Sequence, residues 1–437
     1  MRVRRVTRAI VCAALIFAVL CGVCGCAREE RDPIPTGGAV TLPQGEADAS
    51  SADTSSADTT SADTSSAPDT TAEPTPEKRV TFIAAGDNVI HPGIYIDARE
   101  RAAALGQGRA YDFRPMYENV REKIAAADIA FINQETLMAG QGFELSGYPT
   151  FNSPQELGYD LCEVGFDVVS IANNHMADKG AAGLEATIAF WKSLSDRALM
   201  IGGYENEADY NTVRTLEKNG VRFAFLAYTY GTNGLSVYNT DAVLPYLDKA
   251  TVQKQVAAAK AAADVVIVSA HWGDDNGQPV NETQKTYAKL FASLGVDVII
   301  GHHPHLIQPI EWIEGEEGHK TLCFYSLGNF LSEMDSAKNM VGGLAGFEIV
   351  LRGGAVSVEN VTFMPTVFFF NARYRDTKVF YMTEFTDADL AKHWCVCSPK
   401  GRFTPYGSYS EQITMQKLIE YTKGIIDARY LPEQLCG

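Results

Sequence analysis

Histidines, carboxylates and asparagines recur in this sequence directly after short apolar runs. The residues that could bind a ligand or transfer a proton there are Asp87, Glu135, Asn174, His175, His271, His302, His303 and His305. Imidazole and carboxylate together suit borderline transition metals such as Zn, Mn or Fe. The sequence therefore predicts a site for one or two divalent metal ions, provided that the fold brings these segments together.

The strongest element is His303-Pro304-His305, because a His-x-His pair at a strand end can offer nitrogens to two neighbouring metals. The expected ligands are Asp87, Glu135, Asn174, His271, His303 and His305. One of the two carboxylates could bridge two ions. Ions about 3.5–4 Å apart could activate a water and hold the oxygen of a scissile group. His175, directly after a ligand, is placed to protonate a leaving group.

Each residue alone also has an ordinary structural explanation. The asparagine pair ending at Asn174 can be turn chemistry, and His271 before Trp-Gly could be a packed histidine. His302, Asn329 and Asp178 are expected to support the site residues from behind, although Asn329 could merely fix a turn. His91 is either a surface residue or a group behind the ligands. Six clusters in equivalent positions favour the metal site over these separate explanations.

The elements that must position these residues are short, β-branched apolar runs, which are typical of strands buried on both faces. The runs are 80–85, 128–132, 167–172, 264–270, 297–300 and 321–325. Helical patterns separate them, at 115–127, from 153 onward, and at 183–194, 252–263 and 283–294. This alternation predicts an α/β domain with largely parallel pairing. Ligands collect beyond the carboxyl ends of such strands, where all six clusters stand.

The C-terminal part changes character. Residues 346–351 and 355–363 flank Arg352-Gly353-Gly354, a hairpin signal that predicts antiparallel strands extending or covering the sheets. A short extension, 372–437, follows, and residues 411–428 within it have a helical pattern.

The N-terminal part is expected to lie outside the folded domain. Residues 1–25 resemble a secretory signal peptide, and Val23-Cys24-Gly25-Cys26 resembles a lipobox in which Cys26 would carry the lipid. An uncleaved N-terminal anchor is the alternative. Residues 26–78 are of low complexity, with a Ser-Ala-Asp-Thr unit that recurs from Ser51 onward, and are expected to form a disordered tether. The folded part is therefore expected outside the cytoplasm, anchored to the bacterial membrane by lipid.

Charge and cysteine content exclude some classes of function. The formal net charge of -17 gives no electrostatic footprint for nucleic acid, so no nucleic-acid partner is expected. The cysteines after Cys26 form an odd, uneven set that is not a disulfide framework, and a single bridge near the C-terminus stays open. They are Cys162, Cys323, Cys395, Cys397 and Cys436.

Six motifs stand in a fixed order along the chain: Ala85-Gly-Asp87, Asn133-Gln-Glu-Thr136, Ala172-Asn-Asn-His-Met-Ala-Asp178, His271-Trp-Gly273, Gly301-His-His-Pro-His305 and Ser326-Leu-Gly-Asn-Phe330. Together they resemble the CapA family of capsule or poly-γ-glutamate synthesis proteins, a branch of the calcineurin-like metallophosphoesterases. The resemblance implies a CapA-like domain over residues 79–371, folded as a four-layer αββα sandwich with a dinuclear site between strand ends.

The same resemblance implies a role in capsule or poly-γ-glutamate synthesis, export or processing at the cell envelope. The implied partners are an anionic envelope polymer such as poly-γ-glutamate, or a phosphoester, and capsule-synthesis membrane proteins. Three departures matter. The superfamily's first motif, an aspartate followed two residues later by a histidine, is Asp87-Asn-Val here, and Glu135 stands where an aspartate is usual. Asp178 lies three residues beyond His175 rather than adjacent to it.

The missing histidine could leave a single metal, or an altered pair in which His91 takes part. Three hypotheses therefore stay open. The chain is a metal-dependent hydrolase or transferase, a non-catalytic polymer-handling lipoprotein with a structural metal, or a surface lipoprotein without metal.

Overall fold

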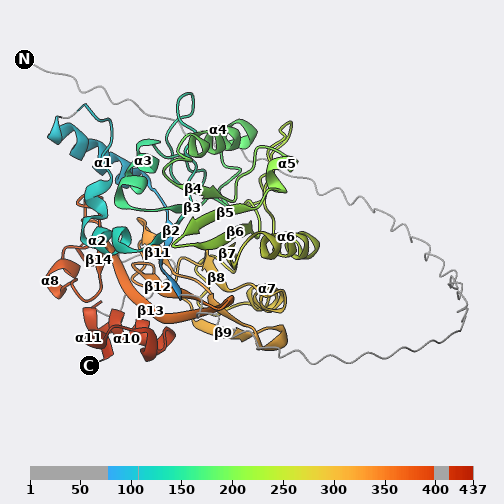
Figure 1. The fold of residues 1–437 in the computed structure, drawn as a ribbon. Coiled ribbons are helices and arrows are strands. Elements are labelled where there is room, and N and C mark those ends of the chain that lie inside the picture. The colour runs from blue at the N-terminus through green and yellow to red at the C-terminus, as the bar shows by residue number, and fades with distance from the viewer. Residues whose placement is uncertain (1–76, 107, 398–412, 437) are drawn as a thin grey trace, which may run out of the picture. The chain divides into compact units, whose positions relative to one another are not determined.

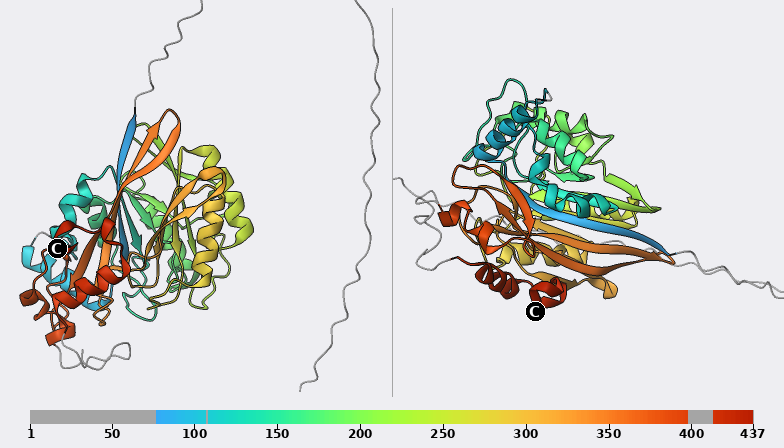
Figure 2. Two further views of the ribbon diagram at one scale, coloured as in Figure 1. Left: turned by 90° about the horizontal axis from the view of Figure 1, so that it is seen from below. Right: turned by 90° about the vertical axis from the view of Figure 1, so that its left-hand side faces the viewer.

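Two β-sheets face each other at the centre of the folded part, and helices cover their outer faces (Figure 1). The computed structural model describes residues 77–106, 108–397 and 413–436. Further views show the same layered arrangement (Figure 2). The predicted α/β class and four-layer αββα sandwich are thus confirmed. The signal peptide, Cys26 and almost all of the tether lie outside the described residues.

The first sheet has the strand order β14-β13-β12-β1-β2-β3-β4, with β11 beside β1. Strands β1 to β4 pair in parallel, and β12 to β14 add antiparallel strands, as the hairpin signal predicts. The strands are β1 (Lys78–Asn88), β2 (Ile129–Gln134), β3 (Val168–Ser170), β4 (Leu199–Ile201), β11 (Asn329–Leu331), β12 (Val341–Arg352), β13 (Ala355–Phe369) and β14 (Lys378–Tyr381).

The second sheet has the order β5-β6-β7-β8-β10-β9. Its four inner strands are parallel, and its two edge strands, β5 and β9, are antiparallel. The strands are β5 (Arg214–Lys218), β6 (Val221–Thr229), β7 (Val265–His271), β8 (Val298–His302), β9 (Ile310–Glu314) and β10 (Lys320–Phe324). The sequence analysis did not assign β6, although it is an apolar run like the others.

The helices connect the parallel strands. Buried side chains of α1 (Pro92–Leu105), α2 (Glu118–Ala126), α3 (Glu156–Val164) and α4 (Gly180–Lys192) join the core that includes the first sheet, whereas α6 (Lys249–Ala262) and α7 (Glu282–Ser293) pack on the second. The remaining helices are α5 (Glu207–Tyr210), α8 (Asp387–Leu390), α9 (Trp394–Cys397), α10 (Met415–Ile425) and α11 (Glu433–Cys436), with 3-10 turns η1 (Arg114–Met116), η2 (Glu316–Gly318) and η4 (Ala428–Tyr430). None of the helices in the described part of the chain has the length and apolar character that a bilayer crossing requires.

Aromatic side chains fill the space between the sheets. Phe82 of β1 stacks on Phe347 of β12, with ring centroids 4.7 Å apart, and contacts Phe225 of β6 at 6.4 Å. Leu418 and Leu435 from the C-terminal helices belong to the same core. Such close packing leaves little freedom for strands to shift, so it also fixes the positions of the strand ends. The five described cysteines are free thiols.

Candidate metal centre

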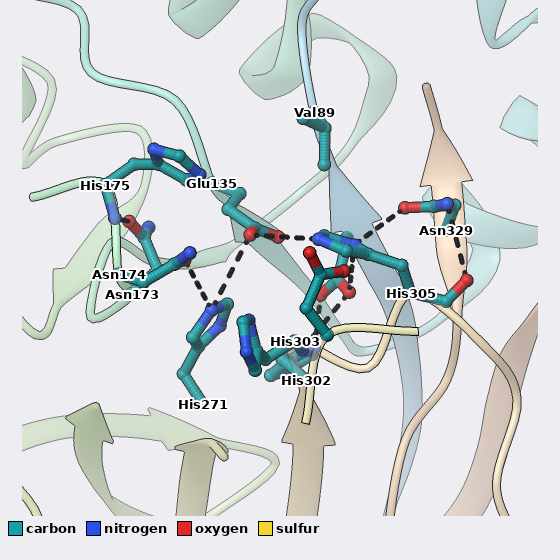
Figure 3. A network of polar contacts seen from close by, with 12 residues as sticks. Val89, Glu135, Asn173, Asn174, His175, His271, His302, His303, His305 and Asn329 are labelled. Carbon is teal, nitrogen blue, oxygen red and sulfur yellow. Dashed lines mark hydrogen bonds and ion pairs between the residues drawn. The ribbon is translucent and has the colours of Figure 1, made fainter. Parts of the chain in front are cut away.

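The predicted ligands come from strand ends of both sheets and meet between the sheets (Figure 3). Asp87 is the next-to-last residue of β1, and Glu135 directly follows β2. His271 ends β7, while His303 and His305 follow β8. Parallel strands place their carboxyl ends on one edge of each sheet, and the two sheets bring these edges together, which is why segments more than 200 residues apart converge here.

Five of these side chains form two groups of three whose ligand atoms lie within 4.8 Å of one another. Glu135, His271 and His303 make up one group, and Asp87, Glu135 and His305 make up the other. All five residues are buried. Glu135 belongs to both groups, which is the position a carboxylate needs in order to bridge two ions.

The chemistry of these donors fits a divalent cation. Both carboxylate oxygens of Glu135 are buried without a hydrogen-bond partner, and so is Nδ1 of His271 and of His303. Glu135 Oε1 lies 3.6 Å from His271 Nε2 and 3.5 Å from His305 Nε2. Burying an unpartnered carboxylate is costly unless positive charge compensates it. Buried His, Asp and Glu clusters of this kind suggest divalent metal binding.

Asp87 is held by a web of donors. Asn133 Nδ2 donates to its Oδ1 at 2.8 Å, and the His303 backbone N–H donates to its Oδ2 at 3.2 Å. His305 Nδ1 lies 3.1 Å from Oδ2, and His302 Nδ1 lies 3.3 Å from Oδ1. Burial alone would raise the pKa of Asp87, but His302 and His305 hold it well below its usual value.

The imidazoles differ in charge. Burial lowers the pKa of His271 well below its usual value and the pKa of His303 to about 3, so both rings are neutral, as metal ligation requires. Burial also acts to lower the pKa of His305, but Glu135 and Asp87 raise it to about 10. Burial raises the pKa of Glu135 well above its usual value. A cation between the carboxylates would replace the proton of His305, because a histidine that ligates a metal must be neutral.

Asn329 fixes the orientation of His305. Its Oδ1 lies 3.1 Å from His305 Nδ1, and its Nδ2 donates to the backbone oxygens of His305 and Asn339 at 3.4 and 3.2 Å. His302 points toward the first sheet, where its ring stacks on Phe131 at 5.7 Å.

His91 lies outside both ligand groups. Its Nδ1 is 3.1 Å from the Val89 carbonyl oxygen and 3.3 Å from the Glu333 backbone nitrogen. Its ring stands edge-on to Phe151 at 5.2 Å.

Asn174 and His175 lie on the opposite side of the centre from Asn329 (Figure 3). Asn174 Oδ1 is 2.9 Å from His271 Nε2, so this amide oxygen is beside a ligand. His175 Nδ1 lies 2.7 Å from Asp178 Oδ2, which also accepts from the Phe151 backbone N–H at 2.6 Å. Phe151 contacts the His175 ring edge-on at 4.7 Å. These contacts fix the imidazole and leave Nε2 for a ligand.

The backbone itself is constrained here. His303 and His305 have φ angles of 94° and 55°, a region that residues other than glycine rarely occupy. Such conformations persist where the surrounding structure holds them, and they cluster at functional sites. Position 86 requires glycine, because a Cβ there would lie 2.0 Å from the Gly328 carbonyl oxygen. That close approach places Asp87 beside the loop that carries Asn329.

The sequence analysis missed residues that lie in the site. The ring of Tyr230 packs on His303 with centroids 4.5 Å apart, and Asn233 Oδ1 accepts from Asn174 Nδ2 at 3.2 Å. The sequence does indicate them, because the apolar run of β6 ends in the polar cluster Thr229-Tyr-Gly-Thr-Asn, just as the other runs end in polar clusters. That cluster contains no histidine or carboxylate, so its residue types do not indicate a metal site.

A comparison with protein families identifies the chain. The family model described as "Bacterial capsule synthesis protein PGA_cap" matches residues 81–334. This chain belongs to that family. The match includes all six motifs, and the predicted resemblance to the CapA family is confirmed.

Similar proteins of this group include the PGA biosynthesis protein CapA of Bacillus subtilis, 32% identical over 196 residues that cover 44% of this chain and 50% of the relative. The capsule biosynthesis protein CapA of Bacillus anthracis is 31% identical over 204 residues, covering 44% and 47%. A probable polyglutamine synthesis accessory protein of Mycobacterium tuberculosis is 26% identical over 242 residues, covering 52% and 60%. The chain spans about half the length of the two CapA relatives it matches.

Among solved structures, a phosphatase from Mycoplasma pneumoniae has a TM-score of 0.42 at 13% identity, covering 67% of this chain and 95% of that one. The NAD nucleotidase of Haemophilus influenzae has a TM-score of 0.39 at 11% identity, covering 67% and 52%. Similarity at this level is too low to transfer any property of those proteins.

Replacing Asn329 by alanine should lower the affinity for a divalent ion about 10–100-fold, because His305 loses the amide that orients it. The measurement is a competition titration of the protein with a chromophoric chelator. Asn119→Ala is the matched control, since its Nδ2 donates to the Val379 carbonyl oxygen away from the site. Equal affinities in wild type and Asn329→Ala would contradict the role given to this residue.

Proposed function

We propose that this protein acts at the cell envelope in the synthesis, export or processing of capsule polymer, with a metal-dependent hydrolase or transferase site. The ions would be one or two of Mn, Zn or Fe, and their ligands would be Asp87, Glu135, Asn174, His271, His303 and His305. The observation that carries this proposal is Glu135, whose two buried oxygens have no donor and which belongs to both ligand groups. The family supports a polymer such as poly-γ-glutamate as the substrate, and a phosphoester is the alternative.

Divalent ions held there would supply the Lewis acidity that polarises a substrate oxygen. The protein's own residues would do the rest. Asp178 would hold Nδ1 of His175, so that Nε2 of the same ring faces the substrate with the proton for the leaving group. A phosphoester oxygen and the nitrogen of a γ-glutamyl amide both need such a proton. Asn174 would keep His271 in place from the same side.

A second candidate function is a non-catalytic, polymer-handling lipoprotein that keeps a structural metal or none. The observation that favours it is Val89, which stands where the superfamily's first motif has a histidine. Val89 is buried and offers no ligand atom (Figure 3). The group around Asp87 therefore has one imidazole, His305, among the residues that could hold an ion.

His175→Ala should keep its metal and lower turnover of an alkyl phosphate or poly-γ-glutamate about 10²–10⁴-fold, the usual contribution of a general acid. Turnover of p-nitrophenyl phosphate should fall much less, because p-nitrophenolate leaves without a proton. Steady-state rates and metal content of the full-length protein check this, with His319→Ala as a control away from the strand-end clusters. Equal losses on both kinds of substrate would remove the general-acid role. No turnover by wild type on any of them would favour the accessory function.

We further propose that residues 1–25 are a signal peptide, that Cys26 carries a lipid, and that residues 26–78 tether the folded part to the outer face of the membrane. The folded part would comprise the domain 79–371 and the extension 372–437. The support is the lipobox-like sequence before Cys26 and the small polar repeat that follows it. Membrane proteins of capsule synthesis would be its partners there.

Cys26→Ser should move the protein from the membrane fraction to the soluble fraction and abolish incorporation of labelled palmitate. A lipid chain inserts into the bilayer only if the thiol is present to receive it. Cys24→Ser is the control and should change neither result. Membrane association without palmitate labelling in wild type would instead indicate an uncleaved N-terminal anchor.

A further inference from the structure

Residues 230–247, between β6 and α6, form a closed loop beside the candidate metal centre. Its ends are joined at Thr229, whose backbone N–H donates to the Pro245 oxygen at 2.8 Å and whose own oxygen accepts from the Leu247 N–H at 2.9 Å. In the part of the chain that the structure describes, seven large hydrophobic side chains are exposed. Four of them belong to this loop: Tyr230, Leu235, Tyr238 and Tyr246.

Three contacts place the loop along one side of the centre. At its start, the Tyr230 ring packs on His303. Asn233 Oδ1 then accepts from Asn174, and further on the Thr240 hydroxyl donates to Glu185 of α4. Helix α4 begins five residues after His175, the predicted proton donor. The loop therefore extends from the metal ligands to the helix that follows His175.

Tyr230 is an exposed residue whose ring contacts the buried ligands. The ligands that it adjoins are almost completely buried, whereas Tyr230 is 42% exposed. Its ring is nearly parallel to that of His271, at 10° and 6.4 Å, and tilted 38° against His303. Its hydroxyl lies 3.4 Å from Asn233 Oδ1, a long contact that leaves the O–H able to donate to a ligand.

In the outer part of the loop, Val237 packs against the core, whereas the next residue, Tyr238, is exposed. Tyr238 is 74% exposed and lies two residues before the contact with Glu185. Clusters of exposed aromatic side chains are costly to hydrate and mark binding surfaces. Tyrosine suits a chain with both apolar and polar groups, since the ring packs on methylene groups while the hydroxyl forms hydrogen bonds.

We propose that loop 230–247 is the polymer-binding loop of this site, in which Tyr230 positions the repeating unit at the metal ligands and Tyr238 contacts a neighbouring unit. The assignment rests on the proposed function in taking a polymer as the ligand. In this arrangement a small phosphoester would contact Tyr230 alone, whereas a chain would contact both tyrosines. Binding should therefore depend on chain length.

The test is binding of poly-γ-glutamate, as a dimer and as a long oligomer, to the full-length metal-loaded protein by titration calorimetry. Tyr230→Ala should weaken binding of both ligands about tenfold, the loss expected for one aromatic contact. Tyr238→Ala should weaken binding of the long oligomer by a similar factor and leave binding of the dimer unchanged. Tyr159→Ala, an exposed tyrosine on α3, is the control and should change neither.

Circular dichroism and metal content establish that each variant is folded. If Tyr230→Ala does not fold, Tyr230→Phe keeps the ring, and Tyr238→Ala alone decides whether the loop binds the chain. Unchanged binding of the long oligomer in Tyr238→Ala overturns the proposal, and so does a wild-type protein that binds no oligomer.

The outcome also separates this proposal from the proposed function. Oligomer binding without turnover of any substrate contradicts the proposed hydrolase activity and leaves the loop assignment standing. Turnover of p-nitrophenyl phosphate without oligomer binding overturns the loop assignment and leaves the hydrolase standing.

Discussion

Asp87 and Glu135 bring two carboxylates into one buried volume, and the arrangement around them follows from the need to compensate their charge. Like charges repel strongly where water is excluded. Asp87 is compensated by Asn133, His302, His305 and a backbone N–H, but Glu135 has no hydrogen-bond donor. A cation at the shared position would complete both ligand groups. Since β1 and β2 belong to one sheet and β7 and β8 to the other, such a cation would also join the two sheets.

The two sides of the centre differ in what surrounds them. Toward Asn329, the ligands are enclosed by backbone oxygens and amides that hold His305. Toward His175, they meet the imidazole fixed by Asp178 and the exposed ring of Tyr230 (Figure 3). One side therefore anchors the ligands, and the other presents an imidazole and an exposed tyrosine ring. The proposed proton donor and the proposed polymer-binding loop therefore lie on the same side of the centre.

Much of the fold and of the candidate site could be predicted, because the spacing of apolar residues and the polar residues that end each run can be read from short segments of sequence. Short apolar runs ending in polar clusters were enough to predict parallel strands. Such strands put Asp87 and Glu135 at the carboxyl edge of one sheet and the histidines at the carboxyl edge of the other. The residues that hold the ligands could not be predicted in the same way. Asn133 meets Asp87 because β1 and β2 pair in one particular register, which depends on packing across the whole sheet. Tyr230 reaches His303 only because β6 lies beside β7, and its sequence cluster has no metal-binding residue type.

The central claim is that these donors hold a divalent ion, and elemental analysis of the full-length protein purified without added metal tests it most directly. The account predicts one or two equivalents of Mn, Zn or Fe per chain in the wild type. Glu135→Gln should lose most of that metal, because the amide cannot supply the charge that both groups share. Near-zero metal in a folded wild-type protein, with no uptake on reconstitution, would contradict the account.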